Sequence, residues 1–413
     1  MIEYRKSILD NGLTVLTHEA WDTPLAAVNL LYGVGSRNED PRRTGFAHLF
    51  EHLMFGGTER VPDFDGVLSR IGGESNAATN CDYTDYYITL PAGDLETALM
   101  LEADRMASLD ITQRALEVQQ HVVTEEYRQR YMNQPYGDVW LLLRPLCYKV
   151  HPYRWATIGA DIRHVAEATL ADVRAFHNRW YRPSGAVLAI AAPLPHDEQL
   201  RQARQAFGAV AAGQPVEAQP LPAEPEQTAA RELRVRRPVP DSKVYVAWPM
   251  GDHDDPLFRA CDLMTDILGT GTSSRLHQRL VRAEGLFSDV DACISGDQGP
   301  GLVVLSGTVA DGIDPRRAVD ALQAEARRLA DEGPSEHELQ KVINRYENTF
   351  VFGQYKAADR AYGLAYYTWL GDTDLVNREP DLYRRVDTAT LQQAARSVFV
   401  DHHENRLYYE ADR

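Results

Sequence analysis

Two periods of hydrophobic and polar positions recur along the chain. Short apolar runs at 13–16, 27–32 and 86–90 are typical of strands. Longer stretches at 94–132 and 160–180 carry apolar residues at helical spacing and are predicted as helices. Because strands and helices are mixed along the chain, we predict the α+β class.

A stretch without either period divides the chain. Residues 211–231 contain four prolines and no regular spacing of apolar positions, which is typical of an extended linker. We therefore predict a first domain over 1–212, a linker over 213–232 and a second domain over 233–413.

The second half repeats the order of the first in outline. Strands are predicted at 244–248 and 302–306, and helices near 256–268, 315–332 and 335–350. A duplicated unit that faces its copy would place a cleft between the two halves.

Composition excludes some partners. Lys and Arg number 43 against 60 Asp and Glu, which gives a net charge of −17 without a basic cluster, and this argues against nucleic acid or an anionic membrane. Since no run of 18 apolar residues occurs and the start lacks the apolar core of a signal peptide, we expect a cytoplasmic protein, or a periplasmic one if a leader was removed. The four cysteines form no Cys-x-x-Cys pair, so they are interpreted as ordinary thiols.

One short pattern carries chemistry. His48 and His52 stand four residues apart, so on a helix both rings lie on one face and can converge on one metal ion. Glu51 lies between them, and this His-x-x-Glu-His order is the reversed form of a known zinc-peptidase motif. Thr44 is a candidate N-cap for the helix, and 56–58 would end it. The alternative is that both histidines are ordinary residues of an amphipathic helix.

A hydrolytic zinc site needs a third protein ligand. Zinc in such sites takes three protein ligands and leaves one position for water. The best candidate is the pair Glu125-Glu126 on a predicted long helix, although an acidic pair on a helix is more often only a solvated face.

With these residues in view, the chain resembles the M16 (insulinase, or pitrilysin-like) metallopeptidases, in the short two-domain branch that includes mitochondrial processing peptidase subunits. The resemblance implies two similar α/β sandwiches, each a mixed and mainly antiparallel sheet flanked by helices, in a clam-shell arrangement. The segments that carry it run through most of the chain: Asn11-Gly12-Leu13, 33–39, 45–58, Asn76-Ala77, Tyr181-Arg182-Pro183 and Ser274-Arg275-Leu276.

The resemblance also assigns roles to residues. It selects Glu126 over Glu125 as the third ligand of one zinc ion, with Glu51 as general base. It places Asn76 and Ala77 on an edge strand beside the zinc, where a peptide can bind as an added strand. The alternative for Asn76 is a turn residue after two glycines.

Two departures from the family pattern stand out. Active members often carry an acidic residue seven positions before the ligand glutamate, where this chain has Gln119, so we expect modest damage to zinc affinity or rate. Self-sufficient members also carry an arginine and a tyrosine in the second domain, where this chain has Val281 and Ser288. Arg282 and Phe287 are adjacent, so a slip in the alignment or a movement of Arg282 is the alternative.

The expected function is therefore a zinc endopeptidase for short or unfolded peptides. We expect it to be the zinc-bearing half of a heterodimer in which a related M16 subunit supplies the arginine and the tyrosine. The alternatives are a non-catalytic structural subunit and a subunit that binds peptides without cutting them. The acidic excess would favour basic peptides if it lines the chamber.

Overall fold

The computed structural model describes residues 1–215, 220–296 and 298–412. The chain forms two compact units, each assembled from three stretches. The first comprises Met1–Tyr127, Trp155–Leu221 and Phe350–Arg378, and the second comprises Arg128–Arg154, Pro222–Thr349 and Glu379–Arg413. The linker predicted over 213–232 falls partly on 216–219, and the second predicted domain includes 297 and 413, all outside the described residues. The predicted domain bounds and the facing arrangement stay predictions.

The first unit is built on a six-stranded mixed sheet. Its strand order is β1-β2-β6-β3-β5-β4, with β2 and β6 parallel and the other neighbours antiparallel. The strands predicted at 13–16, 27–32 and 86–90 are confirmed and correspond to β2, β3 and β5, with bounds that differ by a few residues. The strands are β1 (Arg5–Ile8), β2 (Thr14–Glu19), β3 (Leu25–Tyr32), β4 (Glu74–Thr79), β5 (Thr84–Pro91) and β6 (Ala186–Ala192).

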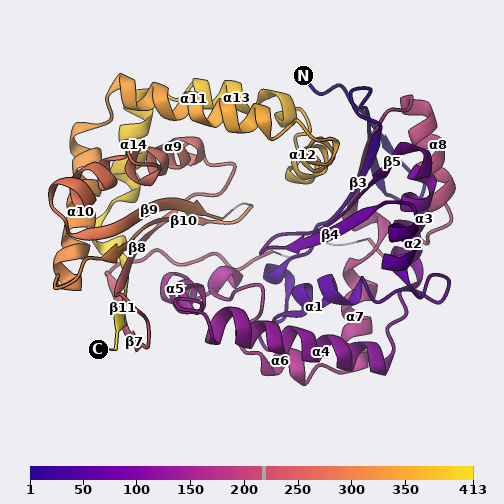
Figure 1. Ribbon diagram of the computed structural model, residues 1–413, viewed down its shortest axis with the longest axis horizontal. Coiled ribbons are helices and arrows are strands. Elements are labelled where there is room, and N and C mark those ends of the chain that lie inside the picture. Colours follow the sequence, from indigo (N-terminus) through magenta and orange to yellow (C-terminus); the bar gives the residue numbers. More distant parts are fainter. Residues whose placement is uncertain (216–219, 297, 413) are drawn as a thin grey trace. The chain divides into compact units, whose positions relative to one another are not determined.

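Helices cover both faces of this sheet. On one face α3 (Leu95–Ser108) packs on β3 and β5, and α8 (His196–Phe207) packs on β2; on the other, α12 (Ala357–Leu370) crosses β3 and β6 (Figure 1). Successive residues of a strand point to opposite faces. Thus Ala27 and Leu31 of β3 pack with α12, whereas Tyr86 of β5 lies under Arg105 of α3.

Further helices gather near β4, the last strand of the sheet. Helix α1 contacts β4, α4 and α7. These helices are α1 (Phe46–Leu53), α2 (Phe64–Arg70), α4 (Gln113–Tyr127), α6 (Arg163–Ala166) and α7 (Leu170–Trp180). The edge of the first sheet and α1 are therefore neighbours.

The single helices predicted over 94–132 and 160–180 are wrong, because each is broken. Leu109 leaves the helix to pair with Thr58, and the Thr112 hydroxyl accepts the N–H of Ala115 to start α4. A π-helix, η3 (Arg128–Met132), then follows α4. In the other stretch, Thr169 caps α7 by accepting the N–H of Asp172 and so separates it from α6. Local capping outweighs the continuous apolar spacing at both breaks.

The second unit repeats the strand pattern of the first. Its order is β7-β11-β8-β10-β9, with β7 and β11 parallel and the rest antiparallel, which matches β2-β6-β3-β5-β4 in order and sense. The predicted α+β class with mixed, mainly antiparallel sheets is confirmed. The strands are β7 (Arg231–Arg237), β8 (Lys243–Met250), β9 (Phe287–Ser295), β10 (Gly301–Val309) and β11 (Asn405–Ala411).

The helices predicted in the second half are also present, and the core of this unit lies between its sheet and α9, α10 and α14. The remaining helices are α5 (Val139–Cys147), α9 (Phe258–Gly269), the π-helix η6 (His277–Ala283), α10 (Pro315–Glu332), α11 (Glu336–Phe352), α13 (Leu375–Arg384) and α14 (Thr388–Val398). Short 3₁₀ turns are η1 (Ser36–Asn38), η2 (Ala92–Asp94), η4 (Pro152–Arg154), η5 (Pro183–Gly185) and η7 (Asp401–His403).

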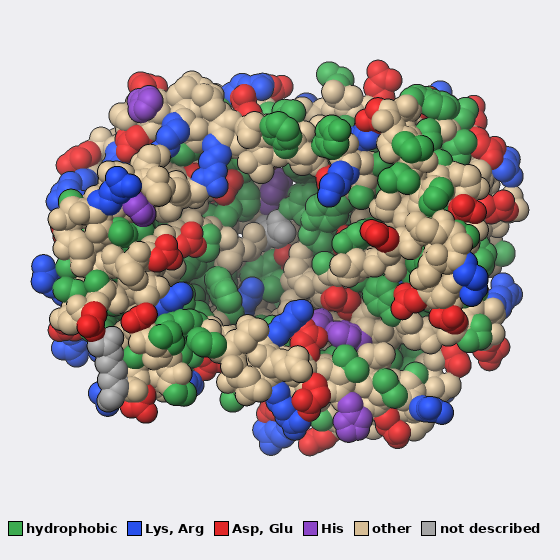
Figure 2. Space-filling view, in the orientation of Figure 1, with side chains coloured by type: hydrophobic (Ala, Val, Ile, Leu, Met, Phe, Trp, Pro, Cys, Tyr) green, Lys and Arg blue, Asp and Glu red, His purple; other side chains and the backbone are tan. Residues whose placement is uncertain are grey.

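The surface and the helices bear on possible partners. On the face that Figure 2 presents, acidic and basic side chains are interspersed, without a large basic area. Within the described parts of the chain, no helix has both the length and the apolar character needed to cross a membrane.

Candidate metal centre

Helix α1 starts at a backbone position that only glycine adopts easily. Gly45 is the N-cap, with φ at 87°, and a Cβ there would lie 2.8 Å from the carbonyl oxygen of Ile158. The predicted cap, Thr44, is wrong: its hydroxyl instead accepts the N–H of Ala160, 2.8 Å away. The Glu39 carboxylate takes the capping role, because it accepts the N–H groups of Gly45 and Ala47, each at 2.9 Å.

Buried aromatic rings hold α1 in place. Phe50 is fully buried and stacks on Phe176 and Tyr181, with ring centroids 5.2 and 5.1 Å away. Tyr86 of β5 donates to the carbonyl oxygen of Phe50 at 3.4 Å, and Arg105 lies over the Tyr86 ring at 4.5 Å. These contacts join α1 to the sheet, so the opposite side of the helix, with its two histidines, is presented in one orientation.

Helix α4 brings the third candidate ligand. Leu116 and Val123 are buried, and the Gln120 amide donates to the carbonyl oxygens of Val165, Ala166 and Ala168 at 2.8 to 3.2 Å. With α4 anchored in this way, Glu126 is half-buried and Glu125 is exposed. The two acidic neighbours therefore have different surroundings.

His48, His52 and Glu126 come together as one group that could hold a metal ion. The His48 and His52 Nε2 atoms are 3.4 Å apart, and they lie 3.5 and 3.2 Å from Oε2 of Glu126. Ligand atoms at the corners of a zinc tetrahedron with bonds of 2.0–2.1 Å are separated by about 3.3–3.4 Å. The two nitrogens and one oxygen thus fit three of the four corners of a zinc site, and the donor set of two imidazoles and a carboxylate suits zinc.

Glu51 lies on α1 outside this group of three. Its side chain is half-buried. Burial is the main cause of the raised pKa values of the Tyr86 and Tyr181 hydroxyls, and the negative charge of Glu51 adds to the rise. Glu51 precedes His52 directly, so it stands next to the candidate metal position without supplying one of the three grouped atoms.

The other predicted residues of the first unit lie on α4 and β4. Gln119 is half-buried on α4, seven residues and so about two turns before Glu126. Asn76 and Ala77 lie on β4, which is an edge strand of the sheet. The Ala77 N–H donates to Oδ1 of Asn76 at 2.9 Å. An added peptide strand can take this N–H only when the Asn76 amide moves away.

In the second unit, the positions expected to carry arginine and tyrosine have other surroundings. Val281 lies on η6 and packs against the core of its unit, and Ser288 is exposed and donates to the carbonyl oxygen of Thr308 at 3.4 Å. Arg282 is exposed, whereas Phe287 is buried in the core. Neither Val281 nor Ser288 offers a guanidinium or a phenol.

Two features were missed from the sequence. Glu39 lies in the segment 33–39 that carries the family resemblance, yet its capping role was not predicted. Asn29 and Asp85 are polar positions inside the apolar runs of β3 and β5, a pattern that signals a functional or paired group in a buried strand. Their meeting on one face of the sheet depends on the register Asn29↔Tyr87 and Leu31↔Asp85, which no single strand specifies.

The chain is similar to known proteins over most of its length. Residues 14–141 match the insulinase family, peptidase family M16, and residues 167–346 match the peptidase M16 inactive domain. The zinc protease PqqE of Helicobacter pylori is 32% identical over 290 residues, which cover 68% of this chain and 64% of that protein. The mitochondrial-processing peptidase subunit beta of Saccharomyces cerevisiae is 29% identical over 210 residues, covering 50% of this chain and 45% of that protein.

A solved structure extends the similarity over the whole fold. The crystal structure of a protease from Helicobacter pylori has a TM-score of 0.93 and 26% identity, and covers 99% of this chain and 100% of that one. Both halves of the chain therefore match domains of one peptidase family, and the chain belongs to peptidase family M16, the insulinase family.

Proposed function

We propose that this chain is a zinc endopeptidase that hydrolyses short or unfolded peptides. The observation that carries the proposal is the group of His48, His52 and Glu126, whose ligand atoms have the separations of a zinc tetrahedron. Relatives named as zinc proteases support the same metal.

Each residue of the centre has a distinct task. His48, His52 and Glu126 would hold the zinc ion, which would supply a water of lowered pKa and a Lewis acid for the scissile carbonyl group. Glu51 accepts a proton from the attacking water on a carboxylate oxygen and passes it to the nitrogen of the leaving amine. Glu39 holds the start of α1 by accepting two of its N–H groups, and so keeps the two imidazoles in place.

The edge strand β4 is the proposed peptide-binding surface. A peptide that adds to β4 would form main-chain hydrogen bonds, which give affinity with little regard for side chains. Asn76 and Ala77 would take part, with the Asn76 amide moving from the Ala77 N–H to the peptide. This arrangement suits extended and unfolded substrates rather than folded ones.

A partner subunit would complete the site. A tyrosine hydroxyl and a guanidinium would hold the substrate carbonyl and stabilise the developing oxyanion, and Val281 and Ser288 can do neither. The similarity to a protein named as one subunit of the mitochondrial-processing peptidase supports a related M16 chain as the partner. Nucleic acid and a membrane are not proposed as partners, and the compartment stays as predicted from the sequence, the cytoplasm or alternatively the periplasm.

A non-catalytic or peptide-binding subunit is the second candidate. The side chains at 281 and 288 favour it, and the match of 167–346 to the domain described as inactive leaves it open. The complete set of His48, Glu51, His52 and Glu126 favours the enzyme, because a structural subunit has no need for that combination.

The test is a comparison of two matched variants. Glu51→Gln should bind zinc as the wild type does and, when mixed with the partner subunit, lose the turnover of a quenched fluorescent peptide that the wild type shows in the same mixture, because the amide cannot take the proton. Glu125→Gln removes an exposed charge nearby and should change neither zinc content nor rate. Peptide cleavage at the wild-type rate by zinc-loaded Glu51→Gln would overturn the role of Glu51.

A further inference from the structure

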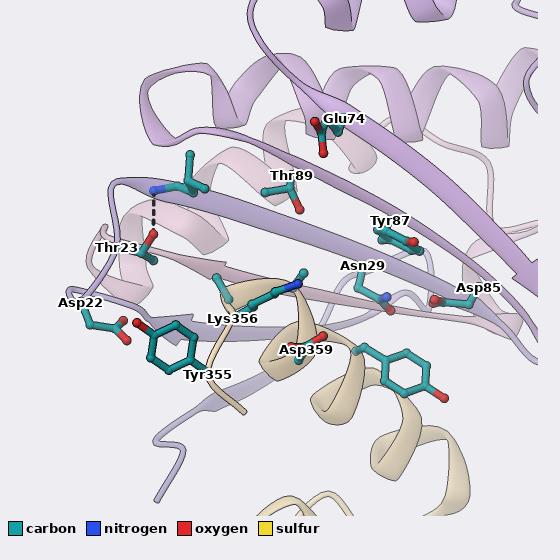
Figure 3. Close-up of a pocket in the computed structure, with 14 residues that line it drawn as sticks. Asp22, Thr23, Asn29, Glu74, Asp85, Tyr87, Thr89, Tyr355, Lys356 and Asp359 are labelled. Carbon is teal, nitrogen blue, oxygen red and sulfur yellow. Dashed lines mark hydrogen bonds between the residues drawn. The ribbon is translucent and has the colours of Figure 1, made fainter. Parts of the chain in front are cut away.

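A pocket of about 740 Å³ lies in the first unit, over the face of the sheet that α12 covers. Strands β3, β4 and β5 and the start of α12 line it, as Figure 3 shows. Glu74 of the edge strand β4 stands at one side of the pocket, and Asn29 and Asp85 stand on the inner strands β3 and β5. The residues of the metal centre do not belong to this lining.

Two polar side chains at its floor are buried and unsatisfied. Asn29 is 1% exposed and Asp85 is 4% exposed. Within the described residues, neither amide atom of Asn29 nor Oδ1 of Asp85 has a hydrogen-bond partner. The two side chains point toward each other across the floor (Figure 3). A buried polar atom without a partner costs about 1–3 kcal/mol, so Oδ1 of Asn29 and Oδ1 of Asp85, which are acceptors, favour a ligand that supplies N–H donors.

The lining is acidic. Four carboxylates and one amine face the pocket, from Asp22, Glu74, Asp85, Asp359 and Lys356. Asp22 is paired with Arg360 at 2.9 Å. Burial raises the pKa of Asp85 to about 7, the nearby Asn29 amide opposes the rise, and the Glu102 carboxylate adds to it. A bound cation would favour the charged form of Asp85.

We propose that this pocket binds a guanidinium or primary ammonium group, held by the Asn29 carbonyl oxygen and the Asp85 carboxylate at its floor. Such a group carries at least three N–H donors, enough for both buried acceptors, and its positive charge complements the Asp85 carboxylate. The group could come from a small free amine or from a basic residue of a peptide, and the second source rests on the proposed function.

The sheet geometry restricts where a basic peptide residue can stand. Neighbouring strands are about 4.8 Å apart, so a peptide added at β4 runs about 10 Å from β5 and about 14 Å from β3. A basic side chain within the paired segment therefore reaches Glu74 but not Asn29. Only a basic residue at the end of the peptide, where the peptide chain no longer pairs with β4, can bring its charge to Asn29 and Asp85.

Lys356 places a positive charge in the pocket and so opposes the binding of a cation. It is an exposed residue at the N-cap of α12, and its side chain extends along the pocket (Figure 3). Its ammonium group repels a second cation, so its removal should tighten binding. This gives the proposal variants with opposite expected effects.

The first experiment measures agmatine binding by calorimetry. The full chain carries the Glu51→Gln substitution, so that peptides used later with the same protein are bound but not cleaved. Asp85→Asn should raise the Kd for agmatine about tenfold or more, because a charge-assisted hydrogen bond is lost. Asn29→Leu should also raise it, Lys356→Met should lower it, and Asp65→Asn on α2, outside the pocket, should leave it unchanged. Thermal unfolding checks that each variant is folded; if Asn29→Leu is not, Asp85→Asn and Lys356→Met still decide.

The second experiment separates the two sources. Peptides with a terminal arginine are compared with the same peptides carrying citrulline, which has the shape of arginine without its charge. Tighter binding of the arginine peptides, lost in Asp85→Asn, assigns the pocket to peptide ends; equal binding with agmatine still bound assigns it to small amines. No saturable agmatine binding, or equal binding by wild type and Asp85→Asn, overturns the proposal.

Failure of this proposal differs from failure of the proposed function. Agmatine binding needs neither zinc nor turnover. A chain that cleaves neutral peptides but ignores agmatine keeps the peptidase and loses the pocket. A chain that binds agmatine but holds no zinc does the reverse.

Discussion

Glu125 and Glu126 are adjacent on α4 but face different surroundings. Glu126 lies within 3.5 Å of both imidazoles, and Glu125 is exposed. Glu126→Gln removes the proposed anionic ligand, so we expect zinc affinity to fall by more than about 100-fold, since loss of groups that only support ligands already costs 10–100-fold. Glu125→Gln has the same change of composition and should leave affinity unchanged. Competition with a chelator measures both, and equal losses in the two variants would contradict the assignment.

Asp85 predicts a pH dependence of stability. Its pKa is about 7 in the folded chain, against 3.8 as the ordinary value, because of burial. Between these values the folded state holds more protons than the unfolded state, so the free energy of unfolding falls as pH rises from about 4 to 7, by up to about 1.4 kcal/mol per pH unit. Asp85→Asn removes this contribution.

The measurement for Asp85 is a difference between two proteins. Other charged groups lie near Asp85, among them Glu74, Lys356 and Glu102, and burial likewise raises the pKa of Glu102. The free energy of unfolding in urea is measured for wild type and Asp85→Asn at several pH values. The contributions of these other groups cancel in the difference between the two proteins. Parallel curves for the two proteins would show that Asp85 is not protonated in the folded state.

At the scale of the element, α1 depends on one glycine. Gly45→Ala would place a Cβ 2.7 Å from Val165 at a φ of 87°, so we expect a loss of more than about 1 kcal/mol and weaker zinc binding. Gly371→Ala is the matched control, because its φ is 106° and nothing lies within 4 Å of the new Cβ. Chemical denaturation and zinc titration of both variants test this, and the contrary result is a larger zinc defect in Gly371→Ala.

The elements also show what the sequence could predict. The apolar runs of β3 and β5 and the apolar positions at helical spacing in α1 were sufficient to predict two strands and a helix, because the spacing of apolar residues shows which face is buried. The breaks at Leu109 and before α7 were not predicted, since a bridge to Thr58 and a capping box override the continuous pattern. Glu39 was missed as a cap because a loop residue several positions before a helix has no fixed spacing from it.

At the scale of the whole molecule, each unit has a mixed sheet with the same core strand order. That order depends on pairings between distant strands, such as β2 with β6, so the sequence predicted the class but not the topology. The candidate metal centre also joins distant segments. His48 and His52 follow from local spacing, whereas Glu126 was selected from the family resemblance rather than from any periodicity.

The central claim is that this chain holds the metal and the base, and that a second chain completes the active site. The most direct measurement is the rate of cleavage of a quenched fluorescent peptide by the zinc-loaded chain, alone and mixed with a related M16 chain that carries the arginine and the tyrosine. We predict bound zinc in both samples, cleavage only in the mixture, and no cleavage when the mixture contains Glu51→Gln. Rapid cleavage by the chain alone would contradict the divided site, and absence of zinc from both samples would contradict the metallopeptidase itself.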